Sequence, residues 1–178
     1  DRCNLACSGG SNACKSTAFA CGKGTRCAVA CSGSGDAVCE GIKVNGQQAA
    51  SLDVSVDITG GQISYYSYYK SGAYTTRHGD NAAKSATIRC PRGSGAAAAS
   101  CKIACKGTAS KKKKDGWTNN SAMRYARSQP SSTCYGMVVD AKQSGAASSV
   151  AVSCTGVGDN MCYSMKVDAS RAAPSHGT

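Results

Sequence analysis

The stretch Cys27-Ala-Val-Ala-Cys31-Ser-Gly-Ser-Gly-Asp-Ala-Val-Cys39-Glu-Gly-Ile-Lys-Val44 has a second, altered copy later in the chain. It aligns without gaps with Val150-Ala-Val-Ser-Cys154-Thr-Gly-Val-Gly-Asp-Asn-Met-Cys162-Tyr-Ser-Met-Lys-Val167, and half of the aligned positions are identical. Chance similarity does not explain cysteines, glycines and a Lys-Val ending that match together. The fold prediction therefore starts from an internal repeat.

Shorter versions of the pattern occur elsewhere. It opens the chain at Cys3-Asn-Leu-Ala-Cys7-Ser-Gly, returns at Cys101-Lys-Ile-Ala-Cys105-Lys-Gly and resumes at Cys134. A cysteine-free copy is expected at Val54-Ser-Val-Asp-Ile58-Thr-Gly, where Val and Ile replace the paired cysteines. We predict five turns that begin near residues 3, 27, 54, 101 and 150. They form one domain over 1–170, with insertions at about 61–86 and 106–133 and a tail at 171–178.

The spacing within each repeat predicts strands. Side chains alternate along a strand, so Cys-x3-Cys places both sulfur atoms on one face. The Ser-Gly, Thr-Gly or Lys-Gly that follows predicts a bend. Short strands and regular corners that repeat at a nearly constant spacing along the chain are typical of solenoids. We therefore predict an all-β, disulfide-stapled β-solenoid (β-helix) of about five turns with two loop insertions. A β-sandwich or an irregular disulfide fold is the alternative.

Large apolar side chains are scarce in this chain. Its only leucines are Leu5 and Leu52, its only Phe is Phe19 and its only Trp is Trp117. Each such side chain contributes roughly 1.5–3 kcal/mol when it is buried. The sequence therefore predicts a narrow core of small residues, reinforced by covalent bonds.

The 13 cysteines stand beside only two histidines, which favours disulfides in an oxidising compartment over extensive zinc ligation. Bridges between neighbouring turns, such as Cys7 with Cys31 or Cys14 with Cys39, and bridges within a turn both fit the spacing. The odd number leaves one thiol free or bonded to another chain. The disulfide candidates are Cys3, Cys7, Cys14, Cys21, Cys27, Cys31, Cys39, Cys90, Cys101, Cys105, Cys134, Cys154 and Cys162.

The pattern Cys-x3-Cys-Ser-Gly-x3-Ala-Cys, followed by a Cys-(Gly/Pro)-x-Gly corner, resembles the cysteine-rich repeats of secreted and surface proteins of protists. The resemblance covers about half of the chain, mainly 3–45, 87–107 and 150–168. It implies a β-solenoid with a structural or adhesive role. The two insertions depart from the pattern, and no role is carried over to them.

The insertions hold the candidate binding residues. Tyrosine gives large contact area at low entropic cost, so the cluster in the first insertion is a candidate interface, with packing against the solenoid face as the alternative. Its members are Tyr65, Tyr66, Tyr68, Tyr69 and Tyr74. In the second insertion, the sequon at Asn119 is a candidate glycosylation site. The lysine run 111–114 is expected to be a solvated loop that suits glycans or acidic polysaccharide.

Catalytic motifs are absent from the sequence or weak in it. No Gly-x-Ser-x-Gly elbow and no complete phosphate-binding loop are present, and Asp53 and Asp57 are expected to face water. We therefore expect no enzyme, no cofactor and no metal site. No run of 18 apolar residues predicts a membrane span. Nucleic acid is not an expected partner, because oxidised extracellular proteins seldom meet it.

The leading functional expectation is a structural subunit of an extracellular filament, surface hair or coat. An uncapped solenoid end is a template for another copy, so the expected partner is the chain itself in a head-to-tail homopolymer. The alternative is a secreted carbohydrate-binding or adhesive module. The expected location is outside the cell or at its surface, as a secreted glycoprotein. The start at Asp1, without a leader, fits a mature secreted chain and fits a fragment equally well.

Overall fold

A computed structural model describes residues 1–67, 72–78, 80–93, 98–109, 121–122, 130, 132–142, 148–158 and 160–169. Over 61–67, 72–78, 109 and 121–122 the description is of the backbone. Every regular element within these ranges is a strand, and none is a helix. The protein is therefore all-β, as the repeat predicted.

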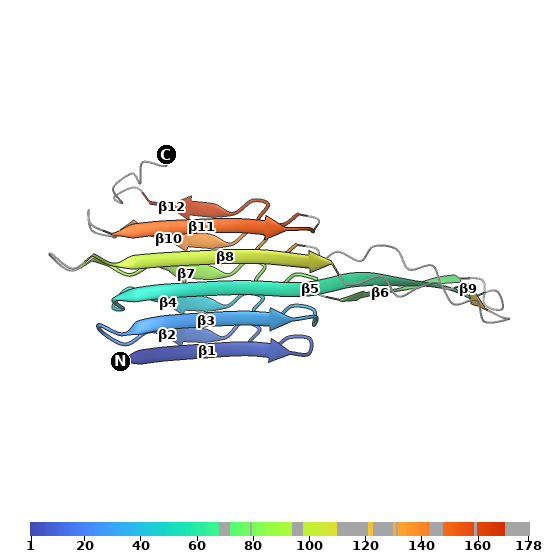
Figure 1. Ribbon diagram of the computed structural model, residues 1–178, viewed down its shortest axis with the longest axis horizontal. Helices are drawn as coiled ribbons and strands as arrows, with labels where there is room; N and C mark the ends of the chain where they lie inside the picture. Colours follow the sequence, from blue (N-terminus) through green and yellow to red (C-terminus); the bar gives the residue numbers. More distant parts are fainter. Residues whose placement is uncertain are drawn as a thin grey trace.

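Ten strands form two parallel sheets, and the chain alternates between them (Figure 1). The first sheet contains long strands in the order β1 (Arg2–Gly9), β3 (Arg26–Gly33), β5 (Ser51–Ser67), β8 (Ser100–Ala109) and β11 (Ser149–Gly156). The second contains short strands in the order β2 (Ala18–Ala20), β4 (Lys43–Asn45), β7 (Thr87–Arg89), β10 (Val138–Asp140) and β12 (Lys166–Asp168). We call each long strand with the short strand that follows it a layer, so five layers are stacked.

The register places like residues over like residues. In the register of β1 and β3, Cys3 lies beside Cys27 and Cys7 lies beside Cys31. Equivalent positions stay aligned through the rest of the stack. The middle of the long-strand sheet is a ladder of inward-facing residues: Leu5, Val29, Val54, Ile103 and Val152. A second ladder, on the short-strand sheet, consists of Phe19, Val44, Ile88, Val139 and Val167. These columns form the narrow core that the composition predicted.

The cysteine-free layer has a register two residues away from the expected one. Leu52 and Val56, rather than Val54 and Ile58, align with Cys27 and Cys31. A shift of two leaves every side chain on the same face of a strand, so alternation alone does not separate the two alignments. The prediction that apolar residues replace the cysteines is confirmed. The positions predicted for these residues are wrong.

A tight turn connects the long strand of each layer to its short strand. Within it, alternate residues have positive φ, as at Ala37, Cys39 and Gly41 in the second layer. The N–H of Ser16 donates to the Glu40 carbonyl at 2.7 Å, and equivalent bonds continue to the last layer. The connecting turns therefore add further columns of hydrogen bonds that hold the stack together.

The long strands of the first, second and last layers end at glycines with φ between 101° and 130°: Gly9, Gly33 and Gly156. Ile58 occupies this position in the third layer, and β5 continues straight to Ser67. Its extension pairs antiparallel with β6 (Gly72–His78) and β9 (Ser121–Ala122). This arm projects beyond the stack (Figure 1). The repeated connecting turn begins again by Asp80. Part of this turn therefore lies inside the stretch 61–86 that the sequence assigned to the first insertion.

Gly33→Ala should destabilise the protein, because φ there is +130° and an added Cβ would lie 3.0 Å from the Gly9 carbonyl oxygen. The expected loss is about 1–3 kcal/mol of unfolding free energy. Urea unfolding followed by circular dichroism measures it. Gly10→Ala is the matched control, since nothing lies within 4 Å of an added Cβ there. An equal effect of both variants would contradict this account.

Candidate functional site: the open ends of the layer stack

Six disulfides bond twelve of the thirteen candidate cysteines, and all of them join segments that follow each other along the chain. Four link a long strand to its connecting turn: Cys7–Cys14, Cys31–Cys39, Cys105–Cys134 and Cys154–Cys162. Two link the end of a short strand to the start of the next long strand: Cys21–Cys27 and Cys90–Cys101. The sequence left pairing within a turn and pairing between turns open. The structure has none of the proposed bonds between equivalent cysteines, such as Cys7 with Cys31.

Cysteines are present or absent in pairs. In the third layer, Val56 and Ala83 stand where other layers have a bonded pair. Two corners between layers also lack the bonded pair. Gly46 and Leu52 stand at one of these corners, and Ala141 and Val150 stand at the other. The equivalent positions at the remaining corners hold the bonded pairs Cys21–Cys27 and Cys90–Cys101. Each loss of one partner is thus accompanied by loss of the other, which avoids an unpaired thiol in the core.

Cys3 is the exception. It aligns with Cys27 and Cys101, whose partners lie on the corner before the strand. In the part of the chain that the structure describes, Cys3 is a free, half-buried thiol. It lies on β1, at the outer edge of the long-strand sheet.

The two kinds of layer allow a direct test of disulfide stabilisation. Cys31→Val with Cys39→Ala copies the natural pair Val56 and Ala83, and so does Cys105→Val with Cys134→Ala. The bonds close separations of 8 and 29 residues. The chain-entropy account gives losses of about 2.5 and about 3.5 kcal/mol, respectively. The urea midpoint of unfolding, measured under non-reducing conditions, should be lower for the second variant than for the first. Equal midpoints for the two variants would rule out a purely entropic effect.

The ends of the stack differ from its middle in burial. In the short-strand ladder, Val139 is fully buried, whereas Val167, one layer further, is 47% exposed. At the opposite end of the same column, Phe19 is only partly buried. The inward-facing residues Leu5 and Val152 are also half-buried, although Val29 and Ile103 between them are buried. The core therefore reaches both ends as partly exposed apolar surface.

Two backbone groups of the last layer have no partner among the described residues. The N–H of Gly136 donates to the Tyr163 carbonyl at 2.9 Å. Ser164 holds the equivalent position in the last layer, and no described residue accepts a hydrogen bond from its N–H. Conversely, the N–H of Lys166 donates to the Met137 carbonyl, but no described N–H donates to the equivalent carbonyl of Met165. Both groups adjoin β12, the last strand of its sheet, and an unpaired strand edge favours the addition of another strand.

An outward-facing column runs along the connecting turns. The Lys15 Nζ lies 3.0 Å from a Glu40 carboxylate oxygen. Further along, the Lys84 Nζ lies 5.8 Å from the centre of the Tyr135 ring, and the Tyr135 and Tyr163 rings stack with centroids 5.7 Å apart. Sequence reasoning missed this column. Its members are the residues directly after the cysteine of each turn, or after Ala83 in the cysteine-free layer, so an alignment on that cysteine reveals it.

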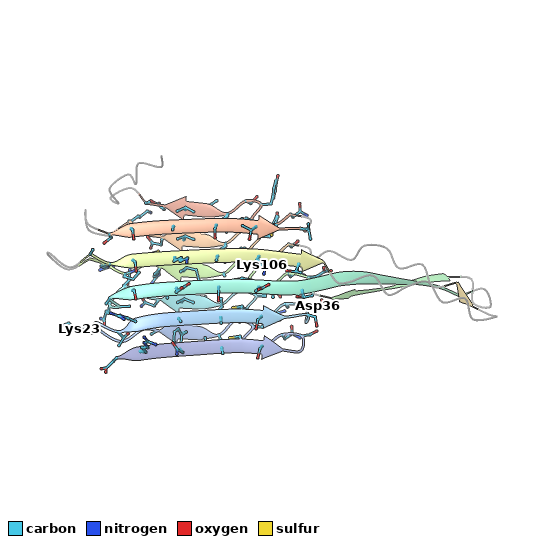
Figure 2. The ribbon with its side chains drawn as sticks, in the orientation of Figure 1. Lys23, Asp36 and Lys106 are labelled. Atoms are coloured by element: carbon cyan, nitrogen blue, oxygen red, sulfur yellow. A yellow bond between two sulfur atoms is a disulfide. The ribbon has the colours of Figure 1, made fainter. Side chains whose placement is uncertain are left out.

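Ion pairs tie neighbouring layers on the outer surface. Lys106, on β8, lies with its Nζ 3.3 Å from the Asp57 carboxylate (Figure 2). Asp53 and Asp57 are both exposed, as alternation predicted. The Lys142 Nζ lies 2.9 Å from Asp168, and this hydrogen bond, together with the Asp168 charge, raises the pKa of Lys142. Exposed pairs like these contribute little to stability.

Lys23 and Asp36 mark opposite ends of the layers in Figure 2. Asp36 connects three successive layers: its N–H donates to the Ser11 Oγ at 3.2 Å, and its carboxylate accepts from the Asp80 N–H at 3.1 Å. The stack is therefore held on its turn side by side-chain as well as backbone bonds.

Three of the tyrosine candidates belong to the projecting arm. Tyr65 and Tyr66 lie on β5 and Tyr74 on β6, with Tyr65 directly opposite Tyr74. The direction of the arm places these positions beyond the stack, not against its face (Figure 1). Tyr68, Tyr69, Asn119 and the lysine run 111–114 lie outside the described residues, and their predicted roles stay predictions.

A shallow basic depression lies along the short-strand sheet. Two hollows there share Arg89. One is also lined by Lys43, Thr87 and the apolar Ala18, Phe19, Ala20 and Val44, and the other by Gln47, Arg92, Lys142 and the Asp140 carboxylate. These cations and polar groups can hold an anionic or hydroxyl-rich ligand.

Cysteine sulfur atoms gather within 4.8 Å of one another in two groups, Cys7 with Cys31 and Cys39, and Cys105 with Cys154 and Cys162. All six atoms belong to disulfides, so none is a thiolate that can ligate zinc. Stacking of equivalent disulfides explains both groups. In this oxidised state neither group offers thiolates to a metal ion.

No protein-family model matches the chain, and searches of curated proteins and of solved structures found no match. The resemblance to protist surface repeats therefore stays a prediction. Among the described residues, no helix is long and apolar enough to cross a membrane. The six disulfides are consistent with a secreted or extracellular protein.

Proposed function

We propose that this protein is a β-solenoid subunit of an extracellular filament, surface hair or coat, and that copies assemble by stacking end to end. The observation that carries the proposal is the continuity of the layer register to both ends, where the apolar columns remain partly exposed. Val167 and Phe19 are the last members of one such column. A second copy buries both and continues the sheets.

The symmetry of this contact gives a fibre. The first and last layers are different surfaces, so contact between them is heterologous and leaves one free end of each kind on every oligomer. Addition then continues without closure. The disulfides lie within a chain, so each subunit is braced internally and assembly proceeds through hydrogen bonds and apolar contact. The protein acts as a building unit in this proposal and not as an enzyme.

The alternative function is carbohydrate binding or adhesion, in which glycans or acidic polysaccharide are the ligands. Two features favour it: the arm that carries Tyr65 opposite Tyr74, and the basic depression around Arg89. The arm extends away from the stack, whereas the depression reaches β2 at one of the two stacking surfaces. Adhesion through the arm is therefore compatible with a filament that displays many arms along its length.

Electron microscopy of native, unreduced protein should show thin, uniform filaments with an axial spacing of ~4.8 Å, the separation of neighbouring strands. Reduction with a thiol reagent should soften or dissolve them, because the layers lose their internal bonds. Filaments should be more extensive at high ionic strength, since the net charge of +11 repels neighbouring subunits. Dispersed monomers under all of these conditions would exclude the filament function.

A matched pair of valine variants tests which surface assembles. Val167, inward-facing at the open end, is 47% exposed; Val138, outward-facing on β10, is 38% exposed. Val167→Lys should abolish filaments, because the contact would bury its charge, whereas Val138→Lys should leave them intact. Light scattering and microscopy measure the difference. Filaments from the Val167 variant, or their loss in the Val138 variant, would place the contact elsewhere.

A further inference from the structure

Resting on the proposed function, we infer the register of the contact between copies: the last layer of one chain lies in register against the first layer of the next, with Tyr163 facing the next copy's Lys15 and Ala169 facing its Cys3. The inference concerns which residues meet. Assembly as such belongs to the proposed function.

The first argument is the outward column on the connecting turns. It ends in an aromatic ring at Tyr163, which is 61% exposed, and begins in a cation at Lys15. One face of Tyr163 stacks on Tyr135, and Tyr163 belongs to the last described layer of the stack. A cation over a tyrosine ring already occurs inside the chain, where Lys84 lies 5.8 Å from the centre of Tyr135. In-register stacking places Lys15 of the next copy over Tyr163 in a similar relation.

The second argument is the match of backbone groups. Inside the chain, the N–H of Ser16 donates to Glu40, and the N–H of Lys43 donates back to Thr17. At a contact in the same register, the Ser164 N–H meets the carbonyl of the next copy's Lys15, and the Met165 carbonyl meets the N–H of its Ala18. Donors therefore meet acceptors at each of these positions. A contact between two identical ends does not repeat this arrangement.

The third argument is the position of the free thiol. A cysteine at the start of a long strand bonds to the corner residue that follows the preceding short strand, as in Cys21–Cys27 and Cys90–Cys101. At the contact between copies this corner residue is Ala169, one residue after β12. Cys3 therefore meets an alanine, and the in-register contact is not covalent.

The closing experiment supplies the missing partner. Ala169→Cys should form a disulfide with Cys3 of the next copy on air oxidation and give a ladder of covalent oligomers on non-reducing gels. Peptide mapping by mass spectrometry should identify the bond between positions 3 and 169. Cysteine already occupies the equivalent corner positions at 21 and 90, so the fold accepts the change.

Three controls make the result specific. Ala151→Cys places an exposed thiol on the same layer, where its counterpart in this register is Asn4; it should give no ladder. Cys3→Ser combined with Ala169→Cys should remove the ladder. With Ala169→Cys as background, Tyr163→Leu should slow cross-linking about two- to fivefold, whereas Tyr163→Phe keeps the ring and the rate.

The outcomes separate this inference from the function on which it rests. Filaments without the 3–169 bond would overturn the register and leave the filament function standing. Covalent dimers with this bond but no filaments would support the register and exclude the filament. Absence of both would overturn both, and equal cross-linking by the cysteines at 151 and 169 would show random collision and overturn the register.

Discussion

Backbone hydrogen bonding between parallel strands in register is the constraint on which the rest of the structure depends. It fixes neighbouring layers at the strand spacing and places each residue against its counterpart in the next layer. A side chain that suits one layer must therefore suit the layers beside it, which is why valine lies over valine and glycine over glycine. The stack has little interior volume, so a chain with few large side chains can still bury a continuous core.

The sequence predicted the features that the repeat controls. The all-β class followed from the alignment of Cys27–Val44 with its later copy, since residues in equivalent positions have equivalent environments. The sequence could not fix the register of the cysteine-free layer, because Leu52, Val54, Val56 and Ile58 are all apolar at spacing two. It could not choose the disulfide pairing either. Strand spacing and turn width both fall within the reach of a disulfide, as the Cα separation of 6.1 Å in Cys31–Cys39 illustrates.

The outward-facing column and the projecting arm were not predicted from the sequence. The column from Lys15 to Tyr163 shows no repeated residue type in the sequence, because its chemistry changes at nearly every layer, from ion pair to cation–π contact to stacked rings. The arm arises where Ile58 stands in the position of a left-handed glycine, so the strand continues where its neighbours turn. In both cases the information lay in comparison between layers and not in any single motif.

The pairing of cysteines along the chain has a consequence for how such a protein changes in length. Every disulfide closes between segments that are consecutive in sequence, and turn positions lose both cysteines together, as at Val56 and Ala83. A repeat cut at the middle of two consecutive long strands, such as Val29 to Val54, holds both partners of every bond it carries, so it can be duplicated or deleted without stranding a thiol in its neighbours. Bonds between equivalent cysteines of adjacent layers would instead tie the number of layers to even values. Each repeat cut in this way is therefore a modular unit for growth by gene duplication.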